Sequence, residues 1–237
     1  MEASTYISLS RQSGLMNEMR MVANNIANAA TTGYRQQGVM FSEFVRTAPG
    51  QASLSMSRAQ VRETSFEQGT LTQTNGSFDF AIEGDGFFLI ESPNGERLTR
   101  AGSFSPDANG ELVTPQGYRL LDAGGAPVFA PPGAKIAVAS DGTLSADGQP
   151  QGQIGVYMPS DPMALIRQGG VMFDSPGGVE PAEGARMIQG FLESSNVDPI
   201  LQVARMIEVQ RAYEMGQSFL EAEDQRIRNA VKTLIRS

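Results

Sequence analysis

Residues 22–37 read VANNIANAATTGYRQQ, a stretch that begins with helical spacing, carries three asparagines and stops at Thr-Thr-Gly. Each Asn costs roughly 0.6 kcal/mol relative to Ala in a helix, so the trio costs about 2 kcal/mol. Asn24 and Asn28 are one turn apart on one face, and Asn25 lies beside the apolar row. We expect these amides to hydrogen-bond across helices, which fixes register and partner at the expense of stability.

The apolar row around this stretch extends toward the N-terminus. Its members are spaced 4, 3, 4 and 3 residues apart, which is the seam of a two-heptad helix: Leu15, Met19, Val22, Ile26 and Ala29. Gly33 suits the left-handed position just past a helix end. The spacing predicts a helix over about residues 4–31.

The C-terminal region predicts a second, longer helix. Asp198 is a suitable N-cap, and Pro199 suits the first helical position. An apolar row then repeats every seven residues: Met206, Tyr213, Leu220, Ile227 and Leu234. Its companion row is small or polar in places: Val209, Gly216, Glu223 and Ala230. The helix is expected to run for about 38 residues.

The central region has a different composition. Residues 69–175 are rich in Gly, and short apolar runs are separated by the turn dipeptides Asn-Gly and Asp-Gly, which predicts an antiparallel β domain. Residues 34–68 show little periodicity. The sequence therefore predicts an α+β fold in which long N- and C-terminal helices form a paired, coiled-coil stem beside a central all-β domain. The predicted segments are 1–33 (helix), 34–75 (extended connector), 76–190 (β domain) and 191–237 (helix).

Composition excludes several kinds of chemistry. The 237 residues contain neither Cys nor His, so thiol nucleophiles, disulfides and His-based catalysis or zinc sites are impossible. The formal charge of −8 argues against nucleic acid as a partner. Glu83 and Asp85 flank a tight turn and are interpreted as turn residues rather than a glycosidase pair. No catalytic residue, cofactor or metal site is predicted, and the interpretation is a protein that is not an enzyme.

Both predicted terminal helices are longer than an ordinary globular helix and flank a compact β domain. The apolar rows bury too little surface to offset the ordering of so much backbone within one chain. We therefore expect the helices to complete their burial on other copies or other proteins. The predicted assembly residues are Leu15, Met19, Val22, Asn24, Asn25, Ile26, Asn28, Met206, Tyr213, Leu220, Ile227 and Leu234.

Three ordered motifs carry a resemblance that covers nearly the whole chain. They are ANNIANAATTGY at 23–34, the β segment at 78–118 that begins FDFAIEGDGFFLI, and LESSNVDPILQVARMIEVQRAYE at 192–214. Together they resemble the bacterial flagellar axial proteins, the rod and hook family. The opening YISLSRQSGL and the ending AEDQRIRNAVKTL are most similar to the proximal rod protein, and the distal rod protein is the near alternative. Tyr34 stands where many relatives have Phe.

The resemblance implies a structural subunit of the flagellar basal-body rod, which stacks helically into a periplasmic drive shaft that transmits torque. The implied partners are proximal rod neighbours, the distal rod protein, like copies and, in transit, the flagellar type III export apparatus. No nucleic acid or small-molecule substrate is implied. The N-terminus lacks the features of a cleaved signal peptide, in line with that route. An alternative from a different class is a secreted β-rich enzyme or adhesin that acts on polysaccharide.

Overall fold

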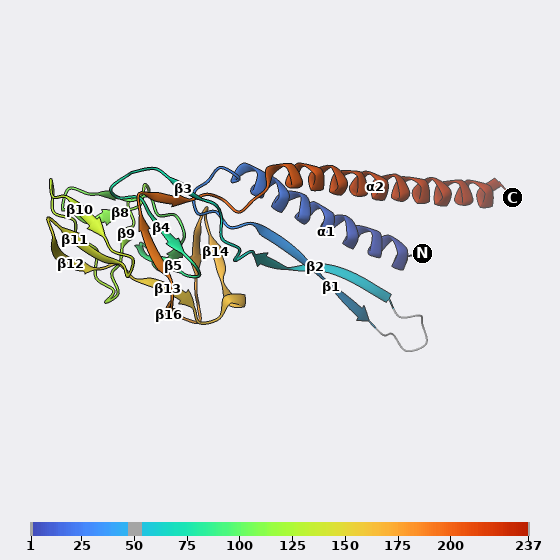
Figure 1. Cartoon of the computed structure of the whole chain (residues 1–237). Coiled ribbons are helices and arrows are strands. Elements are labelled where there is room, and N and C mark those ends of the chain that lie inside the picture. The colour runs from blue at the N-terminus through green and yellow to red at the C-terminus, as the bar shows by residue number, and fades with distance from the viewer. Residues whose placement is uncertain (1, 47–53, 237) are drawn as a thin grey trace. The chain divides into compact units, whose positions relative to one another are not determined.

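The computed structural model describes residues 2–46 and 54–236, which form two compact units. The helix–hairpin unit comprises the described parts of Met1–Ala27, Gln37–Ser65 and Asp198–Ser237, and the β unit comprises Asn28–Gln36 and Phe66–Val197. Figure 1 shows the elements of both units. The fold is α+β with a central antiparallel β domain and a long C-terminal helix, as the sequence predicted.

The helix–hairpin unit contains two helices and a pair of strands. Helix α1 is Glu2–Ala27, helix α2 is Pro199–Arg236, and strands β1 (Gln37–Arg46) and β2 (Leu54–Thr64) pair in antiparallel register. The sequence predicted an extended connector over this region and did not predict that two of its segments pair as strands. The register shifts between Met40 and Phe41, and such a bulge interrupts the alternation by which a strand is recognised.

The two helix boundaries differ in how well they follow local sequence signals. Asp198 caps α2, because its Oδ1 accepts hydrogen bonds from the backbone N–H groups of Ile200 at 2.8 Å and Leu201 at 3.1 Å. The predicted length of about 38 residues for this helix is confirmed. Helix α1 ends at Ala27, four residues before the predicted end. Gly33, with a φ of 68°, donates its N–H to the Glu193 carbonyl at 2.7 Å, so this segment is held in the β unit.

The β unit contains short strands joined by tight turns. The nine-stranded sheet has the order β14-β15-β6-β5-β9-β8-β7, and β13 pairs with both β5 and β16; β10-β11-β12 form a second sheet, and β17–β4 and β18–β3 are separate pairs. All pairings are antiparallel. The bounds are β3 Leu71–Gln73, β4 Phe80–Glu83, β5 Phe87–Ser92, β6 Gly95–Thr99, β7 Ser105–Pro106, β8 Leu112–Val113, β9 Arg119–Leu120, β10 Ile136–Val138, β11 Thr143–Ala146, β12 Gln149–Gln153, β13 Val156–Pro159, β14 Ile166–Gln168, β15 Met172–Asp174, β16 Val179–Pro181, β17 Arg186–Gln189 and β18 Phe191–Glu193, with a 3-10 helix at Pro162–Ala164.

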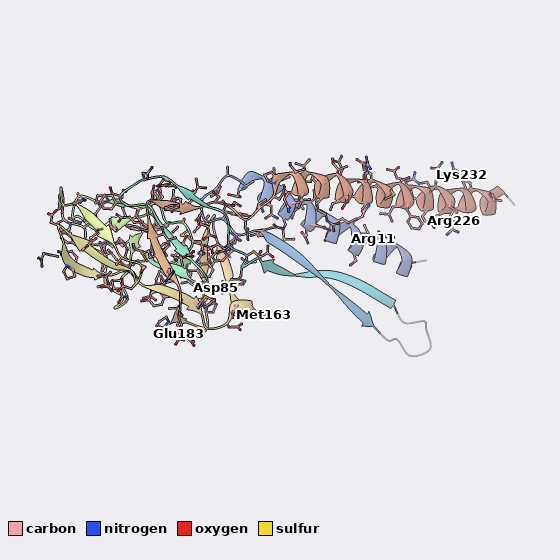
Figure 2. The ribbon with its side chains drawn as sticks, viewed as in Figure 1. Arg11, Asp85, Met163, Glu183, Arg226 and Lys232 are labelled. Atoms are coloured by element: carbon pink, nitrogen blue, oxygen red, sulfur yellow. The ribbon has the colours of Figure 1, made fainter. Side chains whose placement is uncertain are left out.

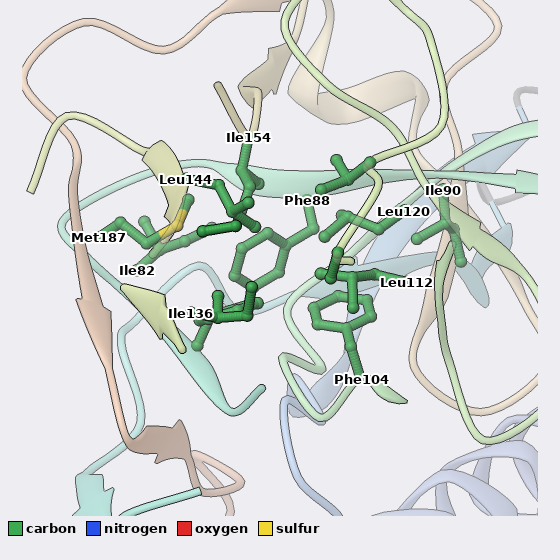
Figure 3. Packing of buried hydrophobic residues seen from close by; sticks show 14 residues of the cluster. Ile82, Phe88, Ile90, Phe104, Leu112, Leu120, Ile136, Leu144, Ile154 and Met187 are labelled. Carbon is green, nitrogen blue, oxygen red and sulfur yellow. The ribbon is translucent and has the colours of Figure 1, made fainter. Parts of the chain in front are cut away.

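The main core of the β unit packs aromatic and aliphatic side chains from many of these strands (Figure 3). Phe88 is fully buried, and its ring meets that of Phe104 edge-on with the centroids 5.5 Å apart. A second cluster around Phe87 and Phe173 lies among the residues of β5, β6 and β15. Four predicted turns are confirmed by the positive φ of their glycines: Asn94-Gly95, Asn109-Gly110, Asp141-Gly142 and Asp147-Gly148.

Candidate assembly surface and a buried charge cluster

The predicted assembly residues occupy several environments. On α1, Val22 and Asn25 are buried, Leu15, Met19 and Ile26 are half-buried, and Asn24 is exposed. Asn28, which is half-buried, lies just after the end of α1 and belongs to the β unit. On α2, Met206, Tyr213 and Leu220 are half-buried and Ile227 is exposed. The side chain of Leu234 lies outside the described residues. The role of these side chains in assembly stays a prediction.

Helices α1 and α2 contact each other within the helix–hairpin unit. Arg205 donates to Glu18 Oε1 from Nε at 2.7 Å and from Nη2 at 2.5 Å. These hydrogen bonds, more than any other influence, raise the pKa of Arg205 above its usual value. A Cβ added at Gly216 would lie 3.5 Å from the Gln12 Nε2 atom, so Gln12 lies opposite Gly216. The helices are therefore antiparallel neighbours.

Among the described side chains of α2, the most deeply buried apolar one is Val209, at 2% exposure, and it belongs to the companion row rather than to the continuous apolar row. Gly216, in the same row, is half-buried against Gln12. Small residues let two helix backbones approach closely, and the larger Tyr213 and Leu220 then flank the contact. The sequence pattern identified both rows, and the structure buries Val209 of the companion row more deeply than the half-buried Tyr213 and Leu220 of the apolar row.

Asn25, one of the three asparagines that are unfavourable in a helix, makes hydrogen bonds that link different elements of the helix–hairpin unit. Its Nδ2 donates to the Gln37 carbonyl at 2.8 Å and to Gln202 Oε1 at 3.2 Å. Its Oδ1 accepts from the Gln37 N–H at 2.9 Å. This single amide, 1% exposed, thus connects α1 to α2 and to the first residue of β1. A hydrophobic side chain of the same size could not satisfy these buried backbone groups.

Several large apolar side chains of α2 remain exposed in the described structure. Ile200 and Ile207 are 81% and 46% exposed, and each lies roughly on the opposite side of the helix from Val209. Met215 and Phe219 are 67% and 51% exposed. A surface helix with one buried stripe ordinarily carries polar residues elsewhere. Helix α2 therefore presents apolar surface beyond what α1 covers.

The β unit contains a cluster of buried charges that sequence analysis did not identify. Glu193 Oε1 lies 3.1 Å from Arg35 Nη2, and Glu193 Oε2 lies 2.7 Å from Arg100 Nε. All three side chains are at most 3% exposed. Glu193 Oε1 also accepts from the Gly69 N–H at 3.0 Å. The Glu193 carboxylate, which lies in the third sequence motif, thus contacts Arg100 of the second motif and Arg35, the residue directly after the first motif.

Backbone carbonyls accept most of the hydrogen bonds that the Arg100 guanidinium donates. Arg100 donates to the carbonyls of Ile82 at 3.1 Å, Gly84 at 3.0 Å and Gly86 at 2.7 Å. The turn that contains Glu83 and Asp85 therefore wraps a buried arginine. Burial lowers the pKa of Arg35 to about 10 and also lowers that of Arg100, and in both cases the Glu193 charge opposes the effect of burial.

A third arginine holds the N-terminal segment of the β unit. The Arg167 guanidinium lies 4.7 Å from the centre of the Tyr34 ring and 4.6 Å from that of Phe173. Its Nη2 donates to the Arg35 carbonyl at 2.5 Å. Burial raises the pKa of Tyr34, and the Arg167 charge acts in the opposite direction. Because this contact uses the ring face, a Phe in place of Tyr34 would preserve it.

The chemistry available elsewhere is limited. Among the described residues, no group of three acidic side chains could hold a metal ion, and no helix is both long and apolar enough for a membrane span. A cavity of about 210 Å³ in the β unit is lined by residues that include Asp141, Gln153 and Tyr157. Asp141 is the one carboxylate among its lining residues, whereas glycoside hydrolysis uses a pair.

Three family models match the chain, and their order along it is that of the three motifs. They are "Flagella basal body rod protein" at residues 6–35, "Flagellar hook protein FlgE/F/G D1 domain" at 81–146 and "Flagellar basal body rod FlgEFG protein C-terminal" at 188–233. The first ends at Arg35, the second includes Arg100 and the third includes Glu193. The buried charge cluster therefore joins all three matched regions.

Full-length relatives agree with these models. Flagellar basal-body rod protein FlgF of Mesorhizobium japonicum is 37% identical, over 99% of this chain and 98% of its own length. FlgF of Caulobacter vibrioides is 34% identical over the same shares of the two chains. Flagellar basal-body rod protein FlgG of Bacillus subtilis is 30% identical over 96% of this chain and 97% of its own. The chain therefore belongs to the flagellar basal-body rod protein family and resembles its FlgF members along nearly its full length.

Proposed function

We propose that this chain, a structural subunit of the flagellar basal-body rod, enters the rod through a stem made of paired helices α1 and α2. The observation that carries the proposal is the antiparallel contact of these helices, which leaves large apolar side chains exposed on α2. A helix that buries one stripe on its own chain and exposes others is suited to a wall of many helices. The stem would form the inner tube, and the β domain would lie outside it.

The proposed partners are other rod proteins, both proximal neighbours and the distal rod protein, together with like copies. Contacts between unlike surfaces that do not close into a ring generate open helical arrays. In this scheme residues 1–33 and 191–237 supply the tube, 34–75 connect it to the β domain, and 76–190 form that domain. Strands β1 and β2, which lie within this connector, belong to the helix–hairpin unit, whereas residues 34–36 and 66–75 belong to the β unit.

The proposed location is the periplasmic part of the basal body, where the assembled rod transmits torque. The chain would reach it through the flagellar type III export channel without a cleaved signal peptide, and it would have no enzymatic role. The cavity of the β unit does not favour a polysaccharide hydrolase, because its lining offers a single carboxylate and glycoside hydrolysis uses a pair.

Leu220→Asp tests the proposed stem in a strain that lacks the chromosomal gene. The change places a carboxylate at a half-buried position of α2, where charge is unfavourable. We expect normal expression and folding of the β unit, with loss of completed rods in purified basal bodies and loss of swimming. Gln217→Asp, at an exposed position three residues earlier, is the matched control and should have a much milder effect. Normal swimming with Leu220→Asp, or equal defects in both strains, would contradict the proposal.

A further inference from the structure

The backbone crosses the border of the β unit four times. The crossings lie between residues 27 and 28, 36 and 37, 65 and 66, and 197 and 198. They are the covalent connections through which a force on the helix–hairpin unit reaches the β unit. Inside the β unit, the segments that lead to the last three crossings are hydrogen-bonded to one another, and a single asparagine makes several of these bonds.

Asn196 is half-buried and precedes Val197, the last residue of the β unit. Its Oδ1 accepts a hydrogen bond from the Gln36 N–H at 2.6 Å, and its Nδ2 donates to the Glu67 carbonyl at 2.8 Å. Its backbone N–H donates to the Tyr34 carbonyl at 3.3 Å. Gln36 lies directly at the second crossing, and Glu67 is the second residue after the third. One asparagine therefore ties three of the four crossing segments together.

The same segments are tied a second time by Arg35. Its Nη1 donates to the Phe66 carbonyl at 3.0 Å and also to the Glu67 carbonyl. The charges of Glu193 and of Asp85, which Figure 2 labels, both favour the charged form of Arg35. Because Arg35 is 3% exposed, this second tie is buried, whereas the asparagine bond to the Glu67 carbonyl is exposed to solvent.

We infer that Asn196 is a positioning residue for torque transmission, because it makes three crossing segments of the β unit act as one bundle. The inference rests on the proposed function. A segment that is not tied can be peeled from the β unit by itself, one hydrogen bond after another, through local unfolding. Tied segments must separate together, which slows their forced unfolding, and the rate of unfolding governs resistance to force. A load that reaches one crossing is thereby shared among three.

The contribution of Asn196 differs in kind from that of the buried Glu193 cluster. Hydrogen bonds that water can replace contribute little to net stability. We therefore expect Asn196→Ala to lower the Tm of the full chain by at most about 4 °C. Asn196→Asp keeps the acceptor for the Gln36 N–H but loses the donor for the Glu67 carbonyl, so its effect under load should be intermediate.

Swimming under increasing viscous load tests the inference in a strain that lacks the chromosomal gene. We expect Asn196→Ala to give wild-type numbers of rods in purified basal bodies and wild-type swimming speed in ordinary medium. In medium thickened with methylcellulose, the fraction of swimming cells should fall severalfold below that of wild type. Asn94→Ala is the matched control, because it removes an exposed amide from the turn between β5 and β6. It should swim like wild type at every viscosity.

Amide hydrogen exchange of the purified full chain reports on the tie itself. The Gln36 N–H should exchange about tenfold faster in Asn196→Ala than in wild type, and at nearly the wild-type rate in Asn196→Asp. Unchanged exchange at Gln36 in Asn196→Ala, a much larger loss of Tm, or the absence of rods would each overturn the inference. If Leu220→Asp abolishes rods while Asn196→Ala swims like wild type under load, only the inference is wrong. If Leu220→Asp leaves rods intact, the proposed function itself is wrong.

Discussion

Glu193 binds Arg35 and Arg100 with the two oxygens of one carboxylate, 3.1 Å from Arg35 Nη2 and 2.7 Å from Arg100 Nε. Arg35 and Glu193 are 158 positions apart in the sequence. The contact therefore joins the segment that follows α1, which contains Arg35, to the central β sequence with Arg100 and to the segment before α2 with Glu193. Both chain segments that continue into the helices are thereby fixed to one buried group of the β unit. The cluster is a structural junction.

Replacing Glu193 with Gln should destabilise the β unit strongly. The change leaves two buried guanidinium groups without a counter-charge, and breaking a buried ion pair in this way costs about 3–5 kcal/mol. Urea unfolding of the full chain, followed by circular dichroism, measures the loss. Glu91→Gln is the matched control, because Glu91 pairs with Arg119 at 3.3 Å on the surface and both side chains are about half exposed. The free energy of unfolding should fall by less than about 1 kcal/mol in the Glu91→Gln variant. Equal effects would mean that the buried cluster is not a stability determinant.

Asn25→Ala should weaken the helix–hairpin unit although alanine is the better helix former. The substitution removes three hydrogen bonds and leaves the Gln37 backbone groups unsatisfied, which costs about 1–3 kcal/mol. The gain in helix propensity from Asn to Ala is small by comparison. A double-mutant cycle with Gln202→Ala isolates the contact between the helices. Asn24→Ala, at an exposed position, should be neutral or slightly stabilising. A stabilising Asn25→Ala would show that these bonds do not form in solution.

Gly216→Ala should stabilise α2 by about 0.5–1 kcal/mol, because Ala is a better helix former than Gly. The new Cβ would lie 3.5–3.6 Å from the Gln12 side chain, which is ordinary contact. Gly33→Ala provides the contrast, since Gly33 has a φ of 68° and its new Cβ would lie 2.4 Å from the Ala101 nitrogen. That variant should be clearly destabilised. Thermal unfolding compares the two, and a destabilised Gly216→Ala would indicate a closer helix contact than the structure shows.

The stability of the β unit should depend on the ionisation of Asp107 in acid. Its Oδ1 accepts from the Asn109 N–H at 2.8 Å and the Glu111 N–H at 2.9 Å, and the Glu111 bond is the main cause that lowers the pKa of Asp107 below its usual 3.8. Because the folded-state pKa is the lower one, the contribution is present above pH 3.8 and is lost as pH falls through the lowered pKa. The stability difference between wild type and Asp107→Asn should therefore shrink on acidification. An exposed carboxylate, changed by Glu183→Gln, is the control; an unchanged difference at low pH would contradict the assignment.

Local signals in the sequence determined the elements of this protein. Asp198 and Pro199 define the start of α2, the heptad spacing defines its helical character, and the Asn-Gly and Asp-Gly pairs define turns in the β unit. These features depend on residues within one or two turns of each other, so a linear pattern contains them. The residues of the three motifs and their order along the chain likewise indicated the family, which the matching family models confirm.

The tertiary structure decided where those elements end and which side chains are buried. Helix α1 stops at Ala27 because the next residues bond to the β unit, as Gly33 does to Glu193. Val209 is buried because it faces α1, although the row that includes Leu220 is the more continuously apolar one. The ion pairs of Glu193 join residues far apart in sequence. No spacing rule contains such contacts, because the free energy of burying a charge depends on the partners that folding brings to it.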